Sequence, residues 1–269
     1  MDLALVGPGR AGSAITLAAR RAGHRISGVL GRDPAASSAA AARLGAEPFL
    51  WGQPVPACDL LLVAVSDDAI SIVAKRLIGQ VGAVGGVAHL SGLTSIAALK
   101  GIGIPFGSFH PLQTLPTPDI GADRLAGAWV AVTTDDDLLG DRLFALAASL
   151  GCHPFELADE QKPLYHAAAA AAANFTLAAL AMSRRLFAAA GVDFAAAAPL
   201  VDAIVANAAA MGPEAALTGP VARGDIGTVQ AQVAAVRTAV PELAEHFIAM
   251  VRATAAIAGT SERIEEALR

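Results

Sequence analysis

Hydrophobic and polar positions follow different patterns in the two halves of the chain. Up to about residue 157, short β-rich apolar runs alternate with helical stretches, and LLLVAV at 60–65 is unbroken, as expected for a parallel strand buried on both faces. Strands are predicted at 3–6, 25–30, 60–65, 87–90, 105–109, 129–133 and 153–157, and helices at 11–21, 34–44, 68–77, 95–99 and 136–150. This alternation predicts βαβ units on a parallel sheet.

From about Asp159 onward the strand pattern stops. Helices are predicted at 160–190, 193–210, 226–239, 241–257 and 261–268, with Gly or Pro near several of their ends. The predicted fold class is therefore α/β, with a parallel-sheet domain over 1–158 followed by an all-α domain over 159–269. The stretch 166–182 is mostly alanine but contains His166 and Asn174, so it predicts a buried helix and not a membrane span.

Composition narrows the class of protein. A length of 269 residues with 55% hydrophobic content allows a core in each domain, and a net charge of -5 without a basic cluster argues against nucleic-acid binding. Cys58 and Cys152 have no metal-site spacing, so they predict buried thiols in a reducing compartment. Met1 leads directly into a strand pattern without the features of a signal peptide, and a cytoplasmic location is expected.

A glycine-rich turn follows the first predicted strand. The apolar run 3–6 leads into Gly7, Pro8, Gly9, Arg10, Ala11 and Gly12, which match G-x-G-x-x-G between a strand and a helix. The first Gly allows a tight turn, the second lets a pyrophosphate approach the backbone, and the third lets the helix pack on the strand. The free N–H groups of the helix then meet the phosphates. This turn predicts a dinucleotide site in a Rossmann unit.

The residues at the end of the second predicted strand indicate whether NAD or NADP binds. An acidic side chain there would bind the ribose 2′-hydroxyl of NAD, whereas this chain has Gly31 and then Arg32, whose guanidinium suits a 2′-phosphate. Asp33 is either a ribose ligand or the N-cap of the helix at Pro34, and the Asp-Pro order favours the cap. NADP(H) is therefore the predicted cofactor.

Later strand ends supply further predicted cofactor contacts. Because the carboxyl ends of parallel strands share one sheet edge, the residues that follow the third and fourth strands belong near the cofactor. They are Val65, Ser66, Asp67, Ser91 and Gly92. A side-chain N-cap by Ser66 or Asp67 is expected as well.

Six segments resemble the Rossmann-like reductases that have a helical C-terminal domain of formerly unknown function. That family is related to ketopantoate reductase, pyrroline-5-carboxylate reductase and the 6-phosphogluconate dehydrogenase-like group. The segments are GPGRAG at 7–12, GRDP at 31–34, HLSG at 89–92, FHPLQT at 109–114, YHAAAAAAANF at 165–175 and LTGPVARGD at 217–225. The resemblance implies a reductase whose substrate lies between the nicotinamide and the helical domain, with ketopantoate (2-dehydropantoate) as the leading substrate.

The first helix after residue 159 carries the candidate catalytic side chains. Lys162, His166 and Asn174 are four and eight residues apart, so on a regular helix they can face one cleft. Pro163 places Lys162 at the helix start, where it is expected to be mobile. Related reductases have Lys-x-x-x-Asn here, and this chain instead has His166 four residues after Lys162. His166 and Asn174 are therefore preferred, either as donors to a substrate or as hydrogen-bond partners in the core.

Candidate substrate contacts come from loops and one later helix. His110 ends a predicted strand and is followed by Gln113 and Thr114, while Asn207, Thr218 and Arg223 lie in the helical half. Arg223 either binds a substrate carboxylate or pairs with Asp225, and the pair is favoured.

These features together predict an NADP-dependent oxidoreductase that reduces a small 2-oxo acid. Imine reduction and a non-catalytic dinucleotide-binding sensor remain as alternatives. The alanine-rich helical domain offers more apolar helix surface than one small bundle needs, so a homodimer through 159–269 is predicted. No metal, membrane or nucleic-acid partner is expected.

Overall fold

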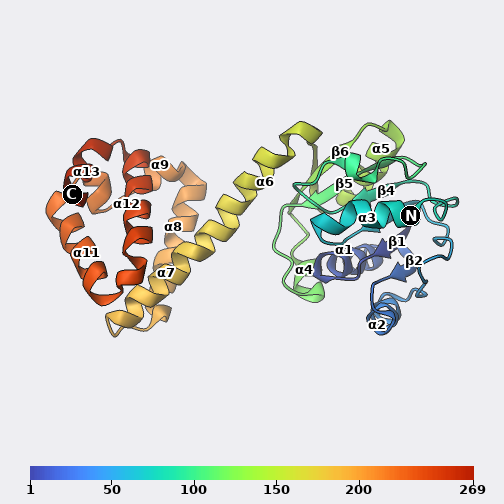
Figure 1. The fold of residues 1–269 in the computed structure, drawn as a ribbon, viewed down its shortest axis with the longest axis horizontal. Coiled ribbons are helices and arrows are strands. Elements are labelled where there is room, and N and C mark those ends of the chain that lie inside the picture. The colour runs from blue at the N-terminus through green and yellow to red at the C-terminus, as the bar shows by residue number, and fades with distance from the viewer. The chain divides into compact units, whose positions relative to one another are not determined.

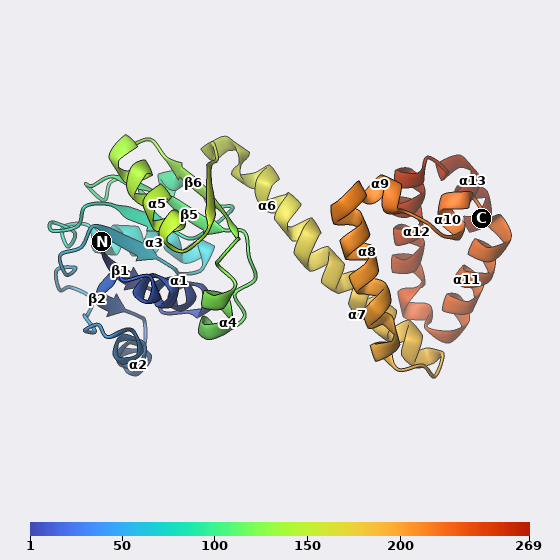
Figure 2. The ribbon, with the colours of Figure 1, turned by 180° about the vertical axis from the view of Figure 1, so that it is seen from behind.

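The computed structural model describes all residues from 1 to 269, and its contacts divide the chain into two compact units, 1–170 and 171–269. Figure 1 and Figure 2 show a sheet with surrounding helices in the first unit and helices alone in the second. The predicted fold class is confirmed: a mostly parallel sheet of Rossmann type is followed by a helical region.

A seven-stranded sheet with the order β2-β1-β3-β4-β5-β6-β7 forms the centre of the first unit. Its strands are β1 (Asp2–Val6), β2 (Arg25–Leu30), β3 (Leu60–Val63), β4 (Val87–His89), β5 (Phe106–Pro111), β6 (Trp129–Thr134) and β7 (His153–Glu156), all within two residues of the predicted bounds. β2 pairs with one side of β1 and β3 with the other. The strand order therefore reverses at β1, and ligands of such sheets bind beside a reversal of this kind.

One strand pair departs from the predicted parallel sheet. β5 and β6 are antiparallel, with Pro111 paired to Val130 and Gly107 to Thr134. The connecting segment 112–128 contains only the short helix α4 (Pro118–Asp123), which the sequence pattern did not predict. Because this connection keeps the chain at the edge where β5 ends, β6 runs back along β5. The prediction of an entirely parallel sheet is wrong at this pair.

Helices and alternating strand residues bury both faces of the sheet. The helices of the first unit are α1 (Arg10–Arg21), α2 (Pro34–Leu44), α3 (Asp67–Leu77), the 3-10 turn η1 (Ile96–Leu99), α5 (Asp137–Ser149), the 3-10 turn η2 (Asp159–Gln161) and α6 (Lys162–Ala170). In β1, Leu3 and Leu5 belong to one core cluster, while Ala4 and Val6 belong to the other. This division is what a parallel sheet covered on both faces requires.

The second unit begins inside a helix that is continuous with α6. Its elements are the π-helical turn η3 (Ala171–Phe175), α7 (Thr176–Ala189), η4 (Phe194–Ala197), α8 (Ala198–Met211), α9 (Pro213–Ala216), α10 (Pro220–Arg223), α11 (Ile226–Ala239), η5 (Pro241–Leu243), α12 (Ala244–Ala258) and α13 (Ser261–Leu268). The main core of this unit lies among α10 to α13 and includes Val229, Val233, Ile248 and Ile264.

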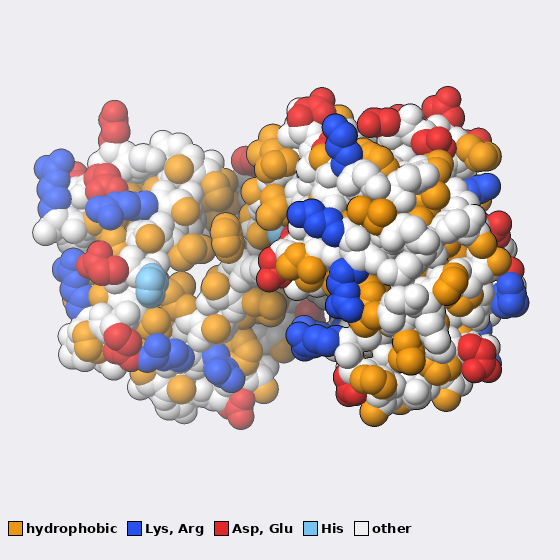
Figure 3. All heavy atoms as spheres, turned by 45° about the vertical axis from the view of Figure 1, so that its right-hand side comes forward, with side chains coloured by type: hydrophobic (Ala, Val, Ile, Leu, Met, Phe, Trp, Pro, Cys, Tyr) orange, Lys and Arg blue, Asp and Glu red, His pale blue; other side chains and the backbone are white.

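The predicted burial of the stretch 166–182 is wrong. Neither α7 nor α8 has a buried residue, and hydrophobic side chains reach the surface of both units in Figure 3. Two helical runs, Asp159–Ala189 and Phe194–Met211, are long and apolar enough to cross a membrane by length and composition alone. An alanine-rich pattern predicts a helix, but it does not determine what covers that helix.

Candidate active site

The turn between β1 and α1 has the geometry of a phosphate cradle. Gly7 has φ +90°, and a Cβ on it would lie 2.5 Å from the Ala64 carbonyl oxygen, so only glycine fits. A Cβ on Gly12 would lie 2.6 Å from the Ala64 Cβ, which explains the close packing of α1 on the sheet. A Cβ on Gly9 would meet no atom within 4 Å. The backbone at Gly9 therefore borders open space at the start of α1, as a pyrophosphate requires.

The tip of β2 has no room for an acidic ribose ligand at Gly31. A Cβ there would lie 2.7 Å from Ser37 Oγ and 3.0 Å from Pro8 Cδ. Asp33 Oδ1 accepts a hydrogen bond of 3.0 Å from the Ala35 N–H, which confirms the predicted N-cap of α2. The Arg32 side chain is exposed and makes no hydrogen bond or ion pair within the chain. These residues fit a ribose 2′-phosphate better than a free 2′-hydroxyl.

The Asp67 carboxylate links the segments that follow β3 and β4 through a hydrogen bond. Val65 packs against Gly7, where an added Cβ would lie 2.9 Å from the Val65 Cγ1. Ser66 occupies the N-cap position of α3 but makes no capping hydrogen bond, so the predicted side-chain cap is wrong. Asp67 Oδ2 instead accepts a hydrogen bond of 2.9 Å from the Ser91 hydroxyl. The Ser91 Oγ in turn accepts a hydrogen bond of 2.8 Å from the Thr94 N–H. The Asp67 carboxylate thus fixes the loop that contains Ser91 and Gly92.

Lys162 is buried, and its ammonium group donates hydrogen bonds to β5 and to the loop that follows β4. Nζ donates to the Ser91 carbonyl oxygen at 3.0 Å and to Ser108 Oγ at 2.7 Å, while the residue is only 1% exposed. Helix α6 begins at Lys162, as Pro163 predicted, but the expected mobility of the side chain is wrong. The two acceptors lie 71 and 54 residues away in the sequence, so no local pattern could reveal them. Burial lowers the pKa of Lys162 from 10.5 to about 8. The negative charges of Asp159 and Asp67 act in the other direction and raise this pKa, but by less.

His110 and Tyr165 form a hydrogen-bonded pair beside Lys162. His110 Nδ1 lies 2.9 Å from the Tyr165 hydroxyl oxygen, and the two rings meet edge to face. Burial, then the charges of Lys162 and His166, lower the pKa of His110 to about 4. Burial raises the pKa of Tyr165 to about 12. Both side chains are therefore neutral near pH 7, and the tyrosine keeps its proton.

Gly92 makes room for the ring of His110. A Cβ on Gly92 would lie 2.7 Å from His110 Cε1 and 2.8 Å from Nε2. Any larger residue would displace that ring and its bond to Tyr165. Gly92, which the sequence predicted as a cofactor contact, thus has a steric role beside His110.

His166 belongs to the same cluster, whereas Asn174 lies in the other unit. The His166 ring centroid is 6.2 Å from that of His110. Asn174 is exposed in the π-helical turn η3, so it is not a core hydrogen-bond partner. A π-helical turn contains more residues than an α-helical turn. The regular helix from which a shared face for Lys162, His166 and Asn174 was predicted is therefore interrupted.

The remaining predicted substrate contacts are exposed side chains. Gln113 Oε1 accepts from the Thr114 N–H at 2.8 Å, and Arg124 Nη1 donates to Thr114 Oγ1 at 3.0 Å. In the second unit Asn207, Thr218 and Arg223 are exposed. The predicted Arg223–Asp225 ion pair does not form, because Asp225 caps α11 through the N–H and hydroxyl of Thr228, at 3.1 and 2.8 Å.

Three polar residues of this site escaped sequence-based prediction. Tyr165 is the one tyrosine of the chain and lies three residues after Lys162, so helix spacing could have identified it. Ser108 gives no such signal, because it is one residue of a buried strand. His89 is fully buried, accepts from the Ser91 N–H at 3.2 Å and has no partner at Nε2. Burial and the Lys162 charge lower the pKa of His89 to about 4, so this ring is neutral.

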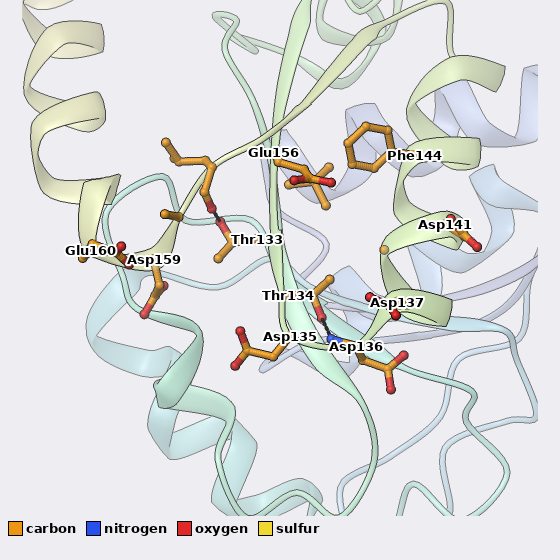
Figure 4. Close-up of a pocket in the computed structure, with 14 residues that line it drawn as sticks. Thr133, Thr134, Asp135, Asp136, Asp137, Asp141, Phe144, Glu156, Asp159 and Glu160 are labelled. Atoms are coloured by element: carbon orange, nitrogen blue, oxygen red, sulfur yellow. Dashed lines mark hydrogen bonds between the residues drawn. The ribbon is translucent and has the colours of Figure 1, made fainter.

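A separate hollow of about 590 Å³ follows β6 and is strongly acidic. Figure 4 shows carboxylates around it, including those of Asp135, Asp137, Asp141, Glu156 and Glu160. Asp136 is occupied as the N-cap of α5, where it accepts from the Leu139 N–H at 2.8 Å. The chain has no group of three or more His, Cys, Asp or Glu placed to hold a metal ion. Carboxylates repel phosphates, so this hollow does not suit a dinucleotide.

The two cysteines take no part in either region. Cys58 and Cys152 are buried free thiols, as predicted, and burial raises their pKa values to about 12 and about 11. Neither thiol is a ready nucleophile near pH 7.

Two known domains match parts of this chain. Residues 1–108 match a Rossmann-like domain, and residues 128–254 match a domain of unknown function, DUF2520. No curated protein matches the sequence of this chain.

Three solved structures share the fold over nearly the whole chain. A presumed NADP oxidoreductase from Bacteroides fragilis is 21% identical, with a TM-score of 0.80 over 95% of this chain and 98% of that one. A protein from Thermotoga maritima is 24% identical, with a TM-score of 0.72 over 94% and 98%. An imine reductase from Myxococcus stipitatus, in complex with NADP+, is 18% identical, with a TM-score of 0.66 over 100% of both chains. The chain therefore combines a Rossmann-like domain with a DUF2520 match, in a fold that it shares with these proteins.

Proposed function

We propose that the chain is an NADP(H)-dependent reductase of a small 2-oxo acid. One observation carries the proposal. The cluster of Lys162, His110 and Tyr165 lies at the edge of the sheet where the parallel strands β1, β3, β4 and β5 end, and the glycine-rich turn after β1 lies at the same edge. In folds of this kind ligands bind at that edge. A cofactor site and a group able to give up a proton therefore belong to the same edge of one sheet.

The residues of the first unit fit an NADP(H) molecule. The open backbone at Gly9 would hold the pyrophosphate, and Arg32 would pair with the 2′-phosphate. Position 31 has no room for an acidic side chain that would repel this phosphate. The Bacteroides protein is named for NADP, and the Myxococcus enzyme holds NADP+. When bound, NADPH supplies the hydride that reduces a carbonyl or imine carbon.

Tyr165 is the proposed proton donor. Lys162 is buried, whereas Tyr165 and His166 are only half-buried and can meet a substrate. With a pKa of about 12, Tyr165 keeps its hydroxyl proton until negative charge develops on the substrate oxygen, and it then transfers that proton. His110 orients the hydroxyl, and the Lys162 ammonium, one turn earlier in α6, stabilises the developing negative charge.

The charge of Lys162 favours an anionic substrate. An ammonium group in buried surroundings attracts a carboxylate more strongly than one in water does. Ketopantoate is therefore the first 2-oxo acid to test. Imine reduction is the second candidate, because the Myxococcus imine reductase shares the fold over the full length of the chain.

The decisive experiment measures NADPH oxidation with a panel of ketopantoate, pyrroline-5-carboxylate and branched 2-oxo acids. The variants are Tyr165→Phe and His166→Ala, with Ala170→Ser in the same helix as the control. We expect Tyr165→Phe to lower kcat by about 100-fold, the usual scale for loss of a general acid, with NADPH affinity unchanged. The control should remain active.

Two other outcomes would redirect the proposal. If His166→Ala loses turnover and Tyr165→Phe does not, His166 is the proton donor. If NADPH binds tightly and no panel compound is reduced, the dinucleotide-binding sensor becomes the better description.

A further inference from the structure

Aromatic rings form a continuous line from the proposed proton donor to the surface of the first unit. The centre of the Phe155 ring lies 6.0 Å from that of Tyr165 and 6.0 Å from that of Trp129. The His153 ring follows, 5.4 Å from that of Trp129. Phe155 is half-buried, whereas Trp129 is 56% exposed and His153 is exposed. We call the surface formed by Phe155, Trp129 and His153 the aromatic wall.

The direction of β6 brings the exposed end of the aromatic wall to the edge of the sheet where ligands bind. Trp129 and His153 are the first residues of the parallel strands β6 and β7, and they pair with each other. Because β6 runs antiparallel to β5, its start lies beside the end of β5, where Val130 pairs with Pro111. The parallel strands β1, β3, β4 and β5 end at this edge. The wall therefore opens at the same edge as the glycine-rich turn.

The aromatic wall shares one face of the sheet with His110. His110 pairs with Ala131 and Ala131 with Phe155, so these three side chains point to the same side. Trp129 lies two residues before Ala131 and points to that side as well. Helix α5 packs on the opposite face, in the core cluster that includes Val132. Trp129 thus stays exposed, because the helix that follows β6 does not cover it.

The aromatic wall lies beyond the part of the sheet that fits the cofactor. In the strand order β2-β1-β3-β4-β5-β6-β7, the glycine-rich turn and Arg32 follow β1 and β2 at one end. The wall belongs to β6 and β7 at the other end, and His110 of β5 lies between them. A dinucleotide bound from Arg32 toward His110 therefore leaves the wall free for the substrate.

A protein partner suits this wall poorly. Pro154 has no backbone N–H and β7 has only 4 residues, so this edge of the sheet is a poor template for an added strand. A stable protein interface buries about 800 Å² on each partner. The three rings present less than that, since an aromatic side chain buries about 150 to 250 Å² and Phe155 is already half-buried. The exposed rings instead match one flat group of a small ligand.

We propose that the aromatic wall binds an aromatic ring of the substrate, so that among small 2-oxo acids the site selects those with a phenyl or similar group. This inference rests on the proposed function. There, Lys162 attracts the carboxylate and Tyr165 meets the carbonyl oxygen, and both groups occur in every 2-oxo acid. A ring one or two methylene groups further along would meet Phe155, which lies one ring-to-ring step from Tyr165. Aromatic pairs prefer such spacings, about 4.5 to 7 Å between ring centres.

The test is calorimetric titration of the full chain with four 2-oxo acids, in the presence of saturating NADP+ so that no ketone is reduced. Pyruvate and ketopantoate have aliphatic tails, whereas phenylpyruvate and 4-phenyl-2-oxobutanoate have a ring. We expect the two phenyl acids to bind about 10-fold more tightly, the effect of burying one ring of this size. Trp129→Ala should weaken their binding by about fivefold, the scale of one aromatic contact, and leave pyruvate binding unchanged. Trp129→Phe, which keeps a ring, should retain most of the preference.

Trp51→Phe is the matched control. Trp51 is the other tryptophan of the chain, and Arg76 Cζ lies 3.9 Å from the centre of its ring. This variant should bind all four acids as the unmodified protein does. It also leaves Trp129 as the one source of an indole N–H signal in a proton–nitrogen correlation spectrum. Phenylpyruvate should shift that signal, and pyruvate should leave it in place.

Three results would overturn the inference. They are equal affinities for the four acids, a Trp129→Ala loss that is the same for pyruvate and phenylpyruvate, and a Trp129 signal that shifts on dilution of the protein alone. The last would show that another copy of the chain covers the wall. Circular dichroism of each variant shows whether it still folds. Because the titrations need no turnover, phenyl acids that bind through Trp129 but are not reduced by NADPH would refute the proposed reaction and leave the wall in place.

Discussion

The two units of this chain bury their helices to different extents. In the first unit both faces of the sheet are covered, and strands such as β3 have only buried residues. In the second unit, α10 to α13 surround a core, but α7 and α8 contribute no buried residue. Both units are rich in alanine. The first unit therefore completes its own packing, whereas in the second unit the side chains of α7 and α8 stay at least partly exposed.

The polar residues divide in the same way. All eight buried polar or charged residues lie in the first unit, among them His89, Ser91, Ser108 and Lys162. Buried polar groups need fixed partners, and fixed partners hold a site in one geometry. The chemistry that we propose therefore belongs to the first unit.

The largest expected effect contrasts the same truncation in the two units. Leu62→Ala in β3 removes a fully buried side chain, so we expect the free energy of unfolding to fall by about 2 to 5 kcal/mol. Leu200→Ala in α8 removes a side chain that is 59% exposed, and a monomer should lose less than about 0.5 kcal/mol. Denaturant titrations of both variants check this. A Leu200→Ala loss that grows with protein concentration would show that a partner covers this side chain.

An intermediate effect tests the cofactor end of the first unit. Arg32→Ala should weaken NADPH binding by about 1.5 to 3 kcal/mol, because a charge-assisted contact with the 2′-phosphate is lost. NADH binding should change little. Calorimetric titration with both cofactors measures the difference, and Arg223→Ala in the second unit is the control. Equal affinities for NADPH and NADH in the unmodified protein would contradict the role given to Arg32.

The smallest expected effect on function is the pH dependence of turnover, which we attribute to Lys162. Its pKa falls from 10.5 to about 8 on folding, so between these values the unfolded chain binds more protons. Stability should therefore rise with pH in this window. Turnover should change in the opposite direction, falling by about tenfold between pH 7 and pH 9 as the ammonium is lost. Thermal melts and rates across this range check both signs, and a turnover that stays constant to pH 9 would remove Lys162 from the reaction.

Local patterns predicted most elements and the cofactor cradle. The bounds of α2, α11 and α13 match the prediction, and so do those of β2. The turn from Gly7 to Gly12 and the Asp33 cap were also predicted correctly, because steric fit and capping depend on neighbouring residues. Prediction failed at the antiparallel β6, whose direction is set by the path of segment 112–128, and at the cap expected from Ser66.

The sequence by itself determined the alternation of strands and helices, the helical second half and the glycine-rich turn after β1, since each follows from periodicity or from a short motif. Only the tertiary structure decided that Lys162 is buried against Ser91 and Ser108, and that His110 bonds to Tyr165. Those contacts join residues 54 to 71 positions apart. A hydrogen bond depends on distance in space, and that distance is set by how β4, β5 and α6 pack, which no local pattern encodes.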